Sequence, residues 1–185
     1  SQHPPAPTGP SSVFVYDPAD PTPTIGGRLL AREAGYHKDT RLARRADVLT
    51  YTGDPLPADL YVVGTAVAEL AHSCDNPNHD VFVRISEVDA RGHSRNVTEA
   101  FVRRTEESGP LRLEFDAVAH RFAAGSRIRV LVAGGSHPRF ARNLGTGEPP
   151  ISGSRLVRAT HTVHHGDGGV SRLVLPAGPH PPSAD

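Results

Sequence analysis

Ser136 and His137 stand side by side after two glycines, in the stretch AGGSHPRFARNLGTGE (residues 133–148). A serine beside a histidine base is the minimum required for nucleophilic attack on an ester or amide. In α/β hydrolases, however, the nucleophile occupies Gly-x-Ser-x-Gly on a sharp strand-to-helix turn. Here Pro138 follows His137, so the last glycine is missing and a continuing helix is disfavoured. Adjacent side chains on an extended chain also point apart. The stretch therefore predicts a loop, and no catalytic residue is assigned to this chain.

Histidines at 161, 164 and 165 raise the question of a metal site. On a strand, His161 and His165 share a face but lie four residues apart, roughly 13 Å. That spacing is too long for two ligands of one zinc ion, and His164 faces the other way. The pattern predicts no metal here.

Asp75 and Asp80 bracket the sequence NPNH. Oxygen ligands at this spacing are compatible with calcium, but the glycine and glutamate of an EF-hand loop are missing. The alternative is a turn whose carboxylates accept backbone N–H bonds or pair with arginine. We expect the second arrangement, with Asp80 structural and Arg127 or Arg129 as its partner. No cofactor is predicted.

Cys74 is the only cysteine, so an internal disulfide is excluded. The expectation is a half-buried, unreactive thiol. Asn96-Val-Thr98 matches a glycosylation sequon, but so short a match carries no weight.

The elements that position these residues are predicted to be strands, because apolar residues alternate with period two. Turn residues at 89–92 and 123–126 separate two pairs of runs. Residues 96–107 are compatible with a helix capped by Thr98, but a strand from Ala100 is favoured. The predicted strands are residues 60–70, 80–88, 111–116, 127–132, 155–165 and 172–175.

The chain has 185 residues, the size of one domain, with 18 glycines and 18 prolines. Such turn-rich composition favours an all-β fold, and we predict two antiparallel sheets in a jelly-roll β-sandwich over residues 12–176. Residues 1–11 and 177–185 are predicted to be flexible tails. The absence of methionine indicates a processed product or a piece of a longer chain.

The formal net charge is zero, so no nucleic-acid partner and no polybasic membrane patch are predicted. No apolar run approaches the ~20 residues that cross a bilayer. A soluble chain is expected, cytoplasmic rather than secreted.

Seven stretches nevertheless occur in a familiar order along nearly the whole chain. They resemble the C-terminal domain of the cocaine esterase / X-prolyl dipeptidyl aminopeptidase family of serine hydrolases. The matching stretches are residues 16–27, 45–51, 73–75 with Asp80, 125–129, 137–140 with Asn143, 146–147 and 171–176.

This resemblance implies a galactose-binding-like jelly roll that is non-catalytic and closes one side of the cleft of an α/β-hydrolase domain. The catalytic domain would belong to the same polypeptide or to a separate subunit. Leu30 and Ala31, after the Gly26-Gly27 pair, fall where the family walls its substrate pocket; the alternative is that Leu29 and Leu30 are ordinary core. His165 falls where the family often has histidine, which implies a hydrogen-bonded structural role, and Asn143 is expected to satisfy local backbone groups.

The predicted function is therefore an ancillary domain of a serine hydrolase that cleaves an ester or X-Pro peptide bond. One alternative is a standalone carbohydrate- or ligand-binding module, although the absence of tryptophan weakens sugar stacking. Another is a small enzyme that uses the histidines. An exposed apolar patch would also allow self-association into a homo-oligomer.

Overall fold

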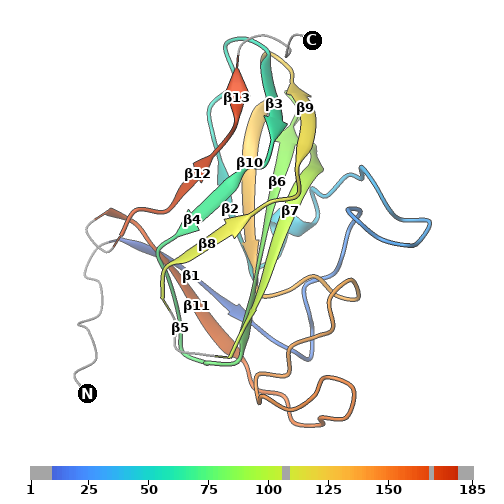
Figure 1. Cartoon of the computed structure of the whole chain (residues 1–185), viewed down its shortest axis with the longest axis vertical. Coiled ribbons are helices and arrows are strands. Elements are labelled where there is room, and N and C mark those ends of the chain that lie inside the picture. Colours follow the sequence, from blue (N-terminus) through green and yellow to red (C-terminus); the bar gives the residue numbers. More distant parts are fainter. Residues whose placement is uncertain (1–9, 106–108, 167–168, 179–185) are drawn as a thin grey trace.

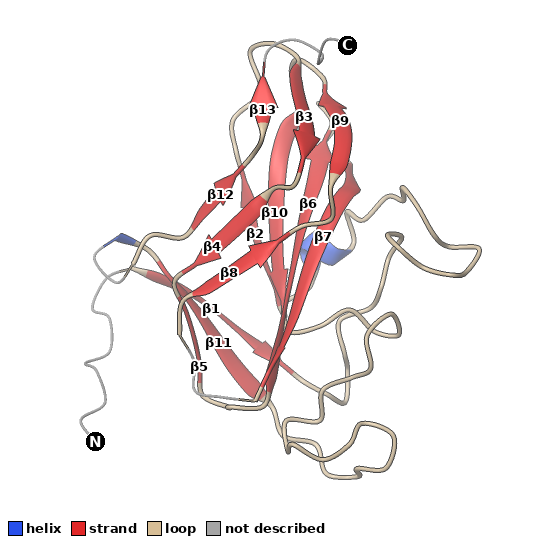
Figure 2. Cartoon of the chain, viewed as in Figure 1, coloured by secondary structure: helices blue, strands red, loops and turns tan. Residues whose placement is uncertain are grey.

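The computed structural model describes residues 10–105, 109–166 and 169–178. Strands and loops make up almost all of it, with a short 3-10 turn, η1 (Leu42–Arg44) (Figure 2). Every ladder between the strands is antiparallel. The strands are β1 (Ser11–Tyr16), β2 (Val48–Thr52), β3 (Leu60–Gly64), β4 (Val67–Leu70), β5 (His72–Cys74), β6 (His79–Val88), β7 (Ser94–Arg104), β8 (Leu111–Glu114), β9 (Val118–Phe122), β10 (Arg127–Ala133), β11 (Ala159–His164), β12 (Arg172–Val174) and β13 (Ala177–Gly178).

The strands form a β-sandwich, as the alternation pattern predicts. The sheet β2-β10-β6-β7 is the rear layer in Figure 1. The front layer consists of two short sheets, β12-β4-β8 and β13-β3-β9, placed end to end along the molecule. A third small sheet, β1-β11-β5, lies at the lower end. The all-β fold class is confirmed; the galactose-binding-like subtype stays a prediction.

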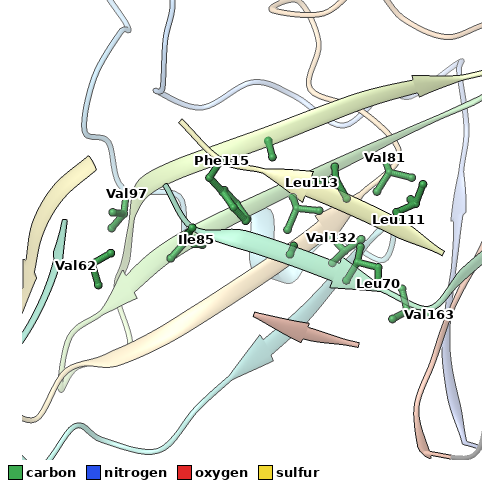
Figure 3. Packing of buried hydrophobic residues seen from close by; sticks show 14 of the residues in the cluster. Val62, Leu70, Val81, Ile85, Val97, Leu111, Leu113, Phe115, Val132 and Val163 are labelled. Atoms are coloured by element: carbon green, nitrogen blue, oxygen red, sulfur yellow. The ribbon is translucent and has the colours of Figure 1, made fainter. Parts of the chain in front are cut away.

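The main core fills the space between the two layers (Figure 3). Val81, Val83 and Ile85 of β6 point into it, as their alternation predicts. Each fully buried aliphatic or Phe side chain contributes about 1.5–3 kcal/mol of transfer free energy. The core also contains Val62, Leu70, Val97, Leu111, Leu113, Phe115, Phe122, Val132 and Val163.

The rear sheet is buried on its outer face as well. There Phe82 and Leu131 join a second apolar cluster with Ile25, and Phe140 packs against it. Two long connections, residues 17–47 and 134–158, supply these covering side chains. Strand β6 consequently has no solvent-facing side, and its polar residues need partners inside the protein.

Two predicted elements differ in detail from the observed ones. Residues 94–104 form one continuous strand, β7, so the strand interpretation is confirmed and the helix capped by Thr98 is wrong. Strand β11 begins at Ala159 rather than at residue 155, and Val157 ahead of it is exposed.

The predicted tails, residues 1–11 and 177–185, lie mostly outside the described residues. Where they are described, they are part of the sheets. Ser11 pairs with His164 in the ladder of β1 with β11, and Ala177–Gly178 form β13 beside β3.

Across the ranges that the structure describes, no helix has the length and apolarity needed to cross a membrane.

Candidate interaction site

The loop of residues 26–36, called here the projecting loop, extends away from the sandwich on the right of Figure 1. Leu30 at its tip is fully exposed, and Tyr36 is 58% exposed. Ala31 beside Leu30 is also exposed. Exposed apolar side chains on a prominent loop are typical of a surface that another protein covers.

The projecting loop is closed at its base by two backbone hydrogen bonds between Gly27 and Gly35, both 2.8 Å. Gly27 has φ +82°, a conformation that L side chains rarely adopt. A Cβ atom there would overlap the carboxylate of Glu99 in β7. The loop base therefore lies directly on the outer face of the rear sheet, and only glycine fits at that point.

Buried polar side chains attach the far end of the loop to the same sheet. Asn96 of β7 donates from Nδ2 to the Gly35 carbonyl (3.0 Å) and accepts from the His37 N–H at Oδ1 (2.6 Å). Two residues further on, the fully buried Asp39 accepts from Ser86 Oγ and Ser94 Oγ, both at 2.6 Å. The loop thus leaves the sheet and returns to it at rigid points.

A buried ion cluster underlies these attachment points. Arg84 of β6 is fully buried, and its Nε and Nη2 donate to Glu99 Oε2 at 3.0 and 2.5 Å. Its Nη1 lies 3.7 Å from Asp39 Oδ2, and Arg139 pairs with the other oxygen of Glu99. Burial lowers the pKa of Arg84 to about 10, against the raising effect of Asp39, so the guanidinium stays charged at neutral pH. Two carboxylates and two arginines form this cluster, so its charges balance.

The cluster is built to position the loop rather than to transfer protons. Both oxygens of Asp39 accept serine hydroxyls, and both oxygens of Glu99 accept arginine N–H groups. A carboxylate whose acceptor sites are filled by fixed donors is poorly suited to act as a general base. Arg28 on the loop, paired with Asp116, extends the charge contacts outward.

Leu30 and Ala31 were predicted to wall a substrate pocket. Both side chains are exposed, so the interpretation of Leu30 as ordinary core is wrong. Their contact with a substrate stays a prediction.

A shallow depression of about 570 Å³ lies in the connection of residues 134–158, and Ile151, which lines it, is 98% exposed. It is lined by His137, Ala141, Arg142, Pro150 and Ile151.

Asp80 is buried, but its partners are not the predicted arginines. Arg103 of β7 donates to its two carboxylate oxygens from Nε and Nη2, both at 2.8 Å, and Asn143 Nδ2 donates at 2.8 Å. Arg127 is exposed, and Arg129 bonds Thr52 Oγ1 instead. Both lie on β10, whereas the residue beside Asp80 across the β6–β7 ladder is Arg103.

Replacing Asp80 with alanine is expected to lower the free energy of unfolding by about 1–3 kcal/mol, because Asn143 and Arg103 lose a buried acceptor. Urea unfolding followed by circular dichroism measures the effect. Asp20→Ala removes a highly exposed carboxylate that also pairs with an arginine, and it should leave the midpoint close to that of the unmodified chain. Equal midpoints for both variants would show that Asp80 has no structural role.

The other predicted polar residues make the following contacts. Asn143 Oδ1 accepts the Gly145 N–H (2.9 Å). Asp75 Oδ1 accepts the backbone N–H of Thr160 (2.7 Å). His165 Nε2 lies 3.1 Å from Ser12 Oγ. Cys74 is half-buried, and burial raises the pKa of its thiol to about 11.

The serine–histidine pair has no catalytic geometry. Ser136 is buried, and its Oγ lies 3.0 Å from Thr24 Oγ1. The His137 side chain is exposed. Its backbone groups bond the segment after β1, through Thr24 N–H to His137 O at 2.6 Å. This stretch therefore links the connection of residues 134–158 to that of residues 17–47 through backbone hydrogen bonds.

The sequence reasoning missed a buried cluster of histidines. His72, His79 and His161 bring their ring centroids within 5.3–5.6 Å of one another. The inward alternation of β11 could have indicated His161, but nothing in the sequence joins it to residues 72 and 79. Within the described ranges, no group of three His, Cys, Asp or Glu side chains is arranged to hold a metal ion.

Fold and site together define an all-β sandwich domain with a projecting loop that exposes Leu30 and Tyr36 and, in its serine–histidine stretch, no nucleophile arrangement. Residues 1–174 match the family model for the X-Pro dipeptidyl-peptidase C-terminal non-catalytic domain. The chain belongs to that family.

Known proteins of this kind are larger than the chain. The cocaine esterase of Rhodococcus sp. (strain MB1 Bresler) is 28% identical over 184 residues, which cover 90% of this chain and 32% of the esterase. An α-amino acid ester hydrolase has a similar fold (TM-score 0.76, 23% identity, 91% of this chain and 32% of that one). So does an aminopeptidase from a marine sediment Thaumarchaeota archaeon (TM-score 0.72, 24% identity, 94% and 34%). The chain therefore spans about a third of the length of these proteins.

Proposed function

We propose that this domain packs against an α/β-hydrolase catalytic domain and closes one side of its active-site cleft with the projecting loop. The catalytic domain supplies the Ser-His-Asp chemistry, and the substrate is an ester or an X-Pro peptide. The observation that carries the proposal is the fully exposed Leu30 on a loop whose ends are fixed to the sheet by buried polar contacts.

Three observations support this role of the loop. Leu30 and Tyr36 are exposed, so covering them would recover hydrophobic free energy. The base of the loop is anchored, so little ordering entropy is lost when a partner binds. Outside the loop, Ile151 is another exposed apolar side chain that a partner could cover. Inter-domain contacts of this kind cover about 600–1,500 Å², more than one side chain provides.

Leu30→Asp in the complete hydrolase is expected to lower kcat/KM at least about tenfold, because burying a carboxylate at the interface opposes closure of the cleft. Steady-state kinetics on an ester and on an X-Pro amide measure the effect. The matched control is Val170→Asp, which changes an exposed valine two residues before β12. Strand β12 lies on the opposite side of the molecule from the projecting loop (Figure 1).

Hydrogen exchange on residues 25–36 separates docking from a purely local effect. Protection should rise when the catalytic domain is present and should not rise with Leu30→Asp. If Leu30→Asp and Val170→Asp give the same kinetics as the unmodified enzyme, the loop is not the contact surface.

A further inference from the structure

The small sheet β1-β11-β5 is joined across its strands by histidine side chains. His161 of β11 stacks on Phe14 of β1, with ring centroids 4.5 Å apart. On the other side its Nδ1 lies 3.1 Å from Nε2 of His72 in β5. On the other face of this sheet, His164 Nε2 lies 2.8 Å from Ser73 Oγ. Imidazole contacts therefore connect all three strands of this sheet.

The contact between His72 and His161 limits the protonation of the two rings. One nitrogen must donate and the other must accept, so at least one ring has to be neutral. Four further ring nitrogens of this region are buried without a hydrogen-bond partner. The ring that accepts in the His72–His161 contact already has its proton on one of these four nitrogens. A further proton on either ring would add a buried N–H without an acceptor or would break the contact between them, and both outcomes are costly. The four are His72 Nδ1, His79 Nε2, His161 Nε2 and His164 Nδ1.

Among the residues that the structure describes, the charged groups near the cluster do not favour a histidinium. Arg104 of β7 is close enough to His72 and His79 to repel a proton there. Asp80 of β6 is the nearby carboxylate, but Arg103 and Asn143 already occupy it. β5 adds the Cys74 thiol, which burial keeps neutral, and β1 adds the apolar Phe14.

We propose that His72, His79 and His161 form an acid-operated latch: the neutral rings hold the β1-β11-β5 sheet closed, and their protonation opens this sheet while the two layers of the sandwich stay folded. The proposal concerns the domain by itself and needs no partner.

The direction of the pH dependence follows from the burial. Burial, with smaller contributions from His79, His164 and Arg104, lowers the pKa of His72 to about 4. Burial also lowers the pKa of His79, and it lowers that of His161 well below its ordinary value. In the opened sheet the rings return to an ordinary pKa of about 6.5. The opened form binds more protons between these values. The latch is therefore fully effective above about pH 6.5 and is lost as the pH falls toward about 4.

The opening is expected to be local because this sheet is short. Strand β5 has three residues, and the ladder of β11 with β5 has three residue pairs. The rear sheet, in contrast, has the ten-pair ladder of β6 with β7 and a core on both faces. A segment held by short ladders can open locally at a lower free energy than that of global unfolding.

Hydrogen exchange of the chain at pH 7 and pH 4.5, corrected for intrinsic rates, tests the latch. One ring with a closed-state pKa of about 4 changes the opening equilibrium on the order of 50-fold between these conditions. Protection of residues 11–16, 72–74 and 159–164 should fall by at least about tenfold, whereas residues 81–88 and 127–132 should keep theirs. A loss spread evenly over all segments would overturn the proposal.

The double variant His72→Gln/His161→Asn keeps a donor–acceptor pair without a titratable ring. Its loss of protection at pH 4.5 should be much smaller than that of the unmodified chain, because only His79 of the three latch residues is left to titrate. The control His137→Gln replaces an exposed histidine and should retain the acid response of the unmodified chain. If the double variant opens in acid as the unmodified chain does, the histidines are not the latch.

An NMR titration of the imidazole nitrogens in the unmodified chain keeps the test independent of whether the variant folds. His72 should titrate near its pKa of about 4, and His79 and His161 should titrate below the ordinary histidine pKa. A ring of this cluster that titrates near pH 6.5 while residues 159–164 remain protected would overturn the proposal.

Discussion

Replacing Glu99 with alanine is expected to lower the free energy of unfolding by about 3–5 kcal/mol, the cost of leaving a buried charge without its partner. Arg84 is fully buried between β6 and β7, and Glu99 accepts both of its short hydrogen bonds. Without Glu99 the guanidinium keeps only Asp39, whose nearest oxygen is 3.7 Å away. Arg139 loses the same acceptor. Urea unfolding followed by circular dichroism measures the effect.

A second variant tests whether the loss of stability comes from leaving Arg84 unpaired. In Arg84→Met/Glu99→Leu both members of the Arg84–Glu99 pair are replaced by apolar groups of similar size. The double variant should be more stable than Glu99→Ala, because the fully buried Arg84 charge is no longer left without Glu99, and Asp39 keeps its two serine donors. Arg139 loses Glu99 in both variants, so its loss does not affect the comparison. Glu69→Ala is the surface control: Glu69 pairs with Arg172 across β4 and β12 in solvent, and its loss should cost below about 1 kcal/mol. Similar losses for Glu69→Ala and Glu99→Ala would show that the buried cluster does not stabilise the domain.

The strands were predictable because their core-facing residues are apolar and recur at every second position. In β6 the residues 81, 83 and 85 alternate into the main core as expected. The opposite face was not predictable, because Arg84 and Ser86 at alternate positions are read as solvent-facing. They are buried because residues 17–47 and 134–158 cover the sheet, and those connections carry no periodic pattern.

The partner of Asp80 shows a second limit. The tight turn at residues 89–92 was recognised, and counting back from it places Val102 opposite Asp80. An irregularity in the β6–β7 ladder after Ile85 shifts the register by one residue and brings Arg103 there instead. A bulge adds one residue on one strand and leaves no clear mark in the sequence. The predicted partners on β10 were wrong because the β10–β6 register places Arg127 opposite Val88 and Arg129 opposite Ser86, at the other end of β6 from Asp80.

Long-range contacts also explain the missed histidines. Residues 72 and 161 become neighbours only through the antiparallel ladder of β11 with β5. His79 joins them because β6 begins at that residue and Asn76 O lies 2.7 Å from its Nδ1. Spacing along the chain, which ruled out a metal site on β11 alone, contains no information about such a cluster.

Gly145→Ala is expected to cost about 3 kcal/mol or more, the second large effect. Gly145 has φ +73°, which costs an L residue about 1–2 kcal/mol. A Cβ atom there would also overlap the carbonyl oxygen of Val157 and come within 2.9 Å of Asn76 Nδ2. Crowding of this kind adds about 1–3 kcal/mol. The backbone on both sides is held in place, because Val157 N–H bonds Leu144 O (2.8 Å) and Asn76 Nδ2 bonds Gly145 O (2.9 Å).

Gly125→Ala separates the two contributions. Gly125 has nearly the same backbone angle, φ +78°, but no atom lies within 4 Å of the position a Cβ would take. Its replacement should therefore cost only the backbone strain of about 1–2 kcal/mol. The additional loss at Gly145 should include the contact that its loop provides, since Asn143 bonds both Gly145 N–H and Asp80. If so, Asp80→Ala will cost less in the Gly145→Ala background than alone, because part of that contact is already gone. Equal urea midpoints for Gly125→Ala and Gly145→Ala would mean that the loop moves aside without loss, and that it does not hold Asn143 against Asp80.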